Sequence, residues 1–137
     1  MKIIVSENNE LYVMPDTTLL RNNDPYFTPN FATEQGETTV EGVTVKITRL
    51  VKCLAEKFAS RAWEEWCTST DHRLLELHHT IARCYDRSFE VSPEWHAKSE
   101  LSEDKCSEID RRVSQVSQYL QLRIGDYIFI PHSELPL

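Results

Sequence analysis

The chain has 137 residues and a formal net charge of −7, from 15 basic and 22 acidic residues. A chain of this length can bury a sizeable core, so residues 1–137 are expected to form a single domain. An acidic chain without a basic stripe is not expected to bind nucleic acid, whose phosphates need clustered Lys and Arg. No apolar run approaches the roughly 20 residues that span a bilayer, so we expect no membrane association and a cytoplasmic protein.

Apolar and β-branched residues predict strands in four places. Lys2–Val5 and Leu11–Val13 form two short strands around the turn-rich residues 6–10. Alternation of apolar and polar residues over Val40–Leu50 predicts a half-buried strand, and Tyr127–Ile130 a buried final strand.

A long ordered loop is expected over Val13–Phe31, where three prolines fix φ and several Asn and Asp residues favour turns. Its anchors are the apolar side chains of Leu19, Leu20, Tyr26 and Phe31. The polar stretch Thr33–Thr39 then connects the loop to the next strand.

Apolar residues at helical spacing predict three helices, over residues 54–66, 70–85 and 109–122. In the first, Leu54, Phe58, Ala62 and Trp66 recur every fourth position. The polar residues Glu94–Glu108 predict a surface loop before the third helix.

The four cysteines lie far apart, and none belongs to a C-x-x-C pair, so a zinc site of the usual spacing is not expected. We expect reduced thiols that are mostly buried. These cysteines are Cys53, Cys67, Cys84 and Cys106.

Five blocks resemble, in the same order, proteins of the fumarylacetoacetate hydrolase family. The blocks are PDTTLLRNNDPYFTPNF, VKITRLVK, EKFASR, IARCYDRSFEVSP and VSQYLQLRIGDYIFI. The resemblance implies an α+β fold, a trimmed mixed β-roll with two or three helices packed outside. It also implies a homodimer, because members of the family commonly associate and a shortened chain gains core from association.

The family's metal site begins with Glu-x-Glu on one strand face and gains a third carboxylate from further along the chain. The resemblance puts Val40 and Gly42 at the two glutamate positions, with Glu41 between them, and the third ligand on Cys67 or Thr68. A one-residue offset on a strand turns a side chain to the opposite face, so Glu41 is a poor substitute unless Gly42 forms a bulge.

Other parts of the family's site also depart from its pattern. The loop with the catalytic histidine is missing between MKIIV and LYVMPD, and Met14 stands where the family carries a Lys. Arg87 replaces a family Gly, and a site-lining hairpin is missing from residues 94–108.

Two functions remain open from these residues. The first is a shortened homologue that has lost the metal site and catalysis, needs no cofactor, and acts as a binding or interaction module. Its pocket, which could hold a small carboxylate, would comprise Met14, Asp16, Arg21, Asn22, Asn23 and Asp86. The second is an active Mg²⁺- or Mn²⁺-dependent hydrolase, isomerase or decarboxylase of acylpyruvate-like diketo acids. It would require Glu37, Glu41 and Asp71 to meet around the metal.

Histidines offer two weaker possibilities. His72 and His79 share a face of the predicted second helix and could bind a metal, but a polar helix surface is the favoured interpretation. His132 and Glu134 are close in sequence, yet they lie in the terminal segment and are interpreted as a chance pair.

Overall fold

The computed structural model describes residues 1–21, 24–30, 36–75 and 80–136. Their strands form one mixed sheet in the order β2-β1-β8-β4-β5-β6-β3, with β7 paired to β5. The strands are β1 (Lys2–Glu7), β2 (Glu10–Pro15), β3 (Leu19–Leu20), β4 (Glu37–Ile47), β5 (Trp63–Leu74), β6 (Phe89–Val91), β7 (His96–Ala97) and β8 (Tyr127–Pro131). The helical segments are α1 (Glu103–Tyr119) and the 3-10 turns η1 (Asp16–Thr18), η2 (Glu56–Ala62), η3 (Thr80–Ala82), η4 (Lys98–Glu100) and η5 (His132–Glu134).

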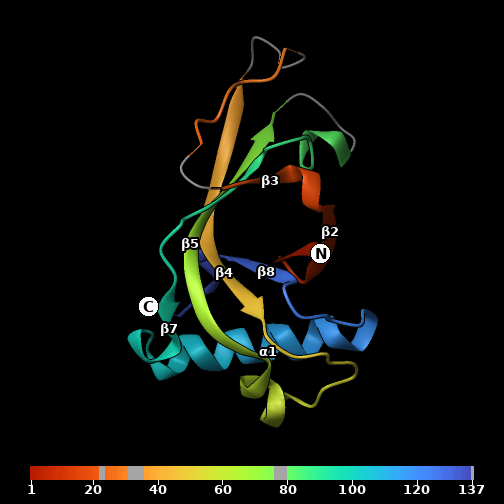
Figure 1. Ribbon diagram of the computed structural model, residues 1–137, viewed down its shortest axis with the longest axis vertical. Helices are drawn as coiled ribbons and strands as arrows, with labels where there is room; N and C mark the ends of the chain where they lie inside the picture. The colour runs from red at the N-terminus through yellow and green to blue at the C-terminus, as the bar shows by residue number, and fades with distance from the viewer. Residues whose placement is uncertain (22–23, 31–35, 76–79, 137) are drawn as a thin grey trace.

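The sheet curls, and α1 lies across one side of it, while β4 and β5 extend together beyond the other strands (Figure 1). This arrangement confirms the expected α+β class and mixed β-roll. Among the described residues α1 is the only α-helix, and the other helical segments are 3-10 turns. No helix in these residues is long and apolar enough to cross a bilayer.

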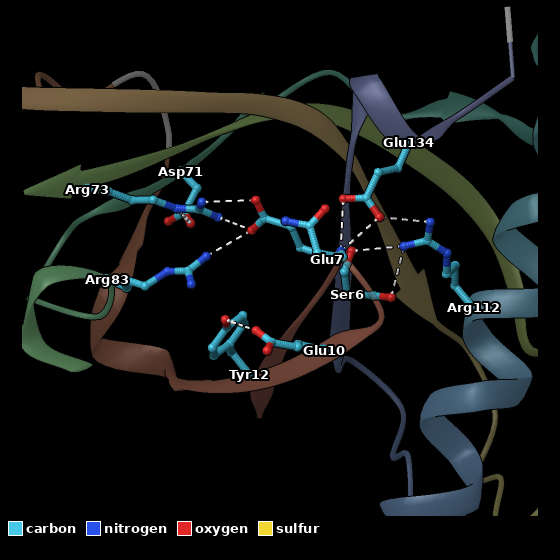
Figure 2. A network of polar contacts seen from close by, with 10 residues as sticks. Ser6, Glu7, Glu10, Tyr12, Asp71, Arg73, Arg83, Arg112 and Glu134 are labelled. Carbon is cyan, nitrogen blue, oxygen red and sulfur yellow. Dashed lines mark hydrogen bonds and ion pairs between the residues drawn. The ribbon is translucent and has the colours of Figure 1, made fainter. Parts of the chain in front are cut away.

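The first two strands form an antiparallel hairpin, as the sequence predicts. Its turn residues Asn8 and Asn9 have φ values of 53° and 62°. Asparagine tolerates this left-handed region, and two successive positive φ values suit the twist of a two-residue hairpin. Glu7, the last residue of β1, directly precedes this turn, and its side chain points toward Arg73 and Arg83 (Figure 2).

Helix α1 begins six residues earlier than predicted and is longer than the predicted helix. Ser102 caps its start, where the Ser102 hydroxyl accepts a hydrogen bond from the Lys105 N–H at 3.3 Å. The helix therefore includes residues 103–108, which were predicted as loop. Its fully buried side chains Ile109, Val113 and Val116 pack on the outer face of β4 and β8.

The predicted helices over residues 54–66 and 70–85 are wrong. Residues 56–62 form η2, and β5 then runs from Trp63 to Leu74. The hydrophobic alternation of a strand is missing because the positions of β5 that face the inside of the curl include the polar Ser69, Asp71 and Arg73. Residues 76–79, with His78 and His79, lie outside the described residues.

The hydrophobic core has an outer and an inner part, one on each face of the sheet, and a small third cluster of Leu74, Ala82 and Tyr85. The outer part lies under α1 and contains Trp63, which is fully buried and donates from Nε1 to Asp110 Oδ1 at 2.8 Å. The inner part contains Phe89 and Phe129, whose rings meet edge to face. Cys67 lies in the inner part, whereas Cys53 is exposed and the other two cysteines are half-buried, so only one of the four thiols is fully buried.

Candidate functional site

The register of β4 and β5 decides which side chains share a face. Val40 lies opposite Asp71, and Gly42 lies opposite Ser69. Directly opposed residues of an antiparallel pair point to the same face, so Asp71 lies on the inner face with the two positions that the resemblance equates with metal ligands. Glu41 lies opposite Thr70, on the other face.

The inner face carries an ion-pair cluster where β1 and β5 approach each other (Figure 2). Arg73 Nε donates to Asp71 Oδ2 at 2.9 Å, and Arg73 Nη2 donates to Glu7 Oε1 at 2.6 Å. Arg83 Nη2 reaches the same Glu7 oxygen at 2.8 Å. Arg73 is therefore a cation held between two carboxylates, in the region where the resemblance would place a metal.

Asp71 is the most deeply buried acid of this cluster, with 1% of its surface exposed. Its Oδ1 has no hydrogen-bond partner. Burial raises the pKa of the Asp71 carboxyl from 3.8 to about 6, although Arg73 and Arg83 lower it. By contrast, Arg73 and Arg83 hold the pKa of the Glu7 carboxyl below its ordinary value despite partial burial.

The raised pKa predicts how stability changes with pH. Between 3.8 and about 6 the folded protein keeps a proton on Asp71 that the unfolded chain has released. The free energy of unfolding should therefore fall by about 3 kcal/mol as the pH rises through this interval. Urea unfolding of the wild type and of Asp71→Asn across this range tests the prediction, since the Asn variant should lose this part of the slope. Equal slopes in the two proteins would contradict it.

A cavity of about 260 Å³ opens beside the cluster. Asp71 and Arg83 line it together with Met14 of β2. The other lining residues are Val5, Leu11, Tyr12, Val13 and Cys84. Met14, which the resemblance equates with the family's Lys, and Asp71 therefore line one cavity, and most of its wall is apolar.

The described residues do not fit a bound divalent metal at this place. Glu41 points to the face opposite Asp71, and β4 has its only register shift between Val45 and Ile47, so no bulge at Gly42 turns Glu41 inward. No group of three or more His, Cys, Asp or Glu side chains in the described ranges is arranged to hold a metal ion. The structure thus does not bring Glu37, Glu41 and Asp71 together.

Gly42 has no room for a side chain. A Cβ built on Gly42 would lie 2.2 Å from the Ile130 carbonyl oxygen and 2.7 Å from Cε1 of Phe129. Real Cβ contacts are essentially never this short, so β8 fills the space that a carboxylate at position 42 would occupy.

The remaining predicted pocket residues are dispersed. Arg21 and Glu41 line a separate hollow of about 390 Å³, which is mainly polar. Asp16 and Arg21 line another of about 330 Å³, with Arg87. Asp86 is exposed and lines none of these hollows, and Asn22 and Asn23 lie outside the described residues.

A contact between a histidine and a glutamate, which the sequence did not predict, lies on the outer face. His72 Nε2 and Glu90 Oε2 are 2.5 Å apart, and the Tyr26 ring stacks on the imidazole with 3.7 Å between centroids. The Tyr26 hydroxyl donates to Glu37 Oε2 at 2.9 Å. Glu37 is thereby engaged in this aromatic cluster. The pairing of β5 with β6 creates the His72–Glu90 contact. This contact could be predicted only if β5 were first recognised as a strand.

Comparison with solved structures identifies the fold. Maleylpyruvate hydrolase from Sphingobium sp. SYK-6 superposes with a TM-score of 0.82 over 95% of this chain, at 14% identity. The chain has the fold of fumarylacetoacetate hydrolase family proteins. A fumarylacetoacetate hydrolase family protein from Yersinia pestis CO92 gives a TM-score of 0.80 over 95% of the chain, at 18% identity. Fumarylpyruvate hydrolase from Pseudomonas aeruginosa, solved with Mn²⁺ and pyruvate, gives 0.76 over 96%, at 12% identity.

The chain covers only part of the length of each of these three structures. The chain spans 60% of the Sphingobium enzyme, 79% of the Yersinia protein and 77% of the Pseudomonas enzyme. No protein-family model and no curated protein sequence matches the chain.

Proposed function

We propose that this chain is a non-catalytic binding module that keeps the fumarylacetoacetate hydrolase fold without metal-dependent chemistry. The observation that carries the proposal is the ion pair on the inner face, in which the guanidinium of Arg73 balances the charge of Asp71. In a catalytic site a divalent cation would polarise a keto-acid and stabilise its developing negative charge. A guanidinium can donate hydrogen bonds but cannot coordinate keto-acid oxygens as a divalent cation does, and Arg73 already donates three hydrogen bonds to Asp71 and Glu7.

The lack of space at Gly42 and the orientation of the Glu41 side chain support the same proposal. Gly42 cannot carry a ligand side chain against β8, and Glu41 projects away from Asp71. The fold alone supplies no activity, because function depends on the residues of the site. We further propose a cytoplasmic homodimer that holds a small carboxylate-bearing molecule.

Metal titration tests the proposal directly. Purified protein is titrated calorimetrically with Mn²⁺ in the presence of oxalate, a planar mimic of the keto-acid group. We expect no saturable binding in the micromolar range, because the described residues provide no cluster of side-chain ligands for a divalent metal.

Micromolar Mn²⁺ binding that disappears in Glu41→Gln would overturn the proposal in favour of an active metal-dependent hydrolase, isomerase or decarboxylase. Thr39→Ala, an exposed change on the same strand, is the matched control for Glu41→Gln. Turnover of an acylpyruvate by the purified protein would overturn the proposal independently.

A further inference from the structure

The cavity beside the ion-pair cluster has two polar groups with unused hydrogen-bonding capacity. Asp71 lines the cavity and its Oδ1 accepts no hydrogen bond. Arg83 lines it as well, and a carboxylate engages this guanidinium at Nη2 alone. Because a guanidinium has five N–H donors, Arg83 retains donors for a second acceptor.

The rest of the cavity is small and mostly apolar, and it includes the Tyr12 ring, over which the Arg83 guanidinium lies at 4.1 Å. The side chains of Val5, Met14 and Leu11 form much of its wall. The volume of about 260 Å³ lies below the range of roughly 300 to 1,000 Å³ typical of drug-sized ligands. The cavity therefore suits a small molecule with one aliphatic arm and a polar end.

The charges around the cavity are balanced. Two acids, Glu7 and Asp71, and two guanidiniums, Arg73 and Arg83, form the cluster. A ligand with a net charge would leave one charge unpaired in a half-buried place, which is costly. A ligand that carries both an ammonium and a carboxylate keeps the balance.

We propose that this cavity binds a free α-amino acid with an aliphatic side chain. The ammonium group donates to Asp71 Oδ1, the carboxylate accepts from the free N–H groups of Arg83, and the aliphatic chain lies along Met14. Of the two polar groups, Arg83 is the more accessible, since 32% of its side chain is exposed. This inference rests on the proposed function, because a metal-filled site would engage the Asp71 carboxylate.

The test compares L-leucine with two analogues that each lack one polar group. These are 3-methylbutylamine, without the carboxylate, and 4-methylpentanoate, without the ammonium. Binding is measured by calorimetry and by NMR shift titration near pH 7 up to about 10 mM ligand. We expect L-leucine to bind saturably, and each analogue to bind at least about tenfold more weakly.

Two variants assign the contacts. Arg83→Gln should weaken L-leucine binding about tenfold and leave the amine unaffected. Asp71→Asn should weaken L-leucine similarly and leave the carboxylate analogue unaffected. Arg111→Gln, on the exposed surface of α1, should change neither. Circular dichroism checks that each variant is folded. If Asp71→Asn does not fold, Arg83→Gln alone still tests the inference.

Three results would overturn the inference. One is 4-methylpentanoate binding as tightly as L-leucine, which would indicate a simple carboxylate site. Another is an equal loss of leucine and amine affinity in Arg83→Gln, which would indicate a structural role. The third is no saturable binding of any of the three compounds. None of these results requires Mn²⁺ binding, so they are distinguishable from failure of the proposed function.

Discussion

Replacing Arg73 with Met is expected to destabilise the fold by about 3 kcal/mol or more at pH 7, because it leaves a buried carboxylate unpaired. Arg73 is the only guanidinium among the described residues that forms an ion pair with Asp71. Met keeps much of the length and apolar volume of the Arg side chain, so the loss reports the charge rather than a cavity. Urea denaturation with fluorescence detection measures the free energy of unfolding.

The dependence of this loss on pH separates an electrostatic cause from a packing cause. At pH 5 the unpaired Asp71 should be protonated in the folded variant, since burial already raises its pKa to about 6 with Arg73 present. The difference from the wild type should then be clearly smaller than at pH 7. A loss that is equal at both pH values would contradict the ion-pair explanation.

Arg111→Met is the matched control for this substitution. Arg111 forms a bidentate pair with Glu108, but 43% of its side chain is exposed. Exposed ion pairs contribute about 1 kcal/mol or less. The control should therefore remain within that range of the wild type, and a larger loss would show that charge removal in general destabilises this acidic chain.

The parts of the fold that the sequence predicts well are those with a regular apolar pattern. The hairpin of β1 and β2, the strand β4 and the strand β8 all show this pattern and are all present, although β4 spans Glu37–Ile47 and not the predicted Val40–Leu50. The strand β5 lacks it, because Ser69 and Asp71 face the inside of the curl. Apolar residues from Leu54 to Trp66 happen to recur at helical spacing, and this coincidence produced the wrong helix.

The candidate site depends on contacts that local patterns do not encode. Asp71 and Arg73 are two residues apart, so they share a face once β5 is recognised as a strand. Glu7, the partner of Arg73, comes from β1, and Arg83, which pairs with the same Glu7, follows η3. Only the curled sheet brings these segments together. The orientation of Glu41 away from the face of Val40 and Gly42, in contrast, follows from the alternation of strand faces and was expected from the sequence.

Substituting Ala for Gly42 is expected to destabilise the protein by about 3 kcal/mol, because the added methyl group collides with backbone and not with a flexible side chain. The Cβ would lie 2.2 Å from the Ile130 oxygen, where β4 pairs with β8 in the centre of the sheet. Relief requires the two strands to separate locally. The urea midpoint should therefore fall while the denaturant slope stays the same.

Thr39→Ala, at an exposed position of β4, is the matched control and should change stability by less than about 1 kcal/mol. If Gly42→Ala is as mild as this control, β4 can move away from β8 and the steric argument against a ligand at position 42 fails. A severe loss has the opposite meaning. It would imply that introducing a glutamate at position 42 requires β8 to be repacked first, so one substitution cannot place a metal ligand there.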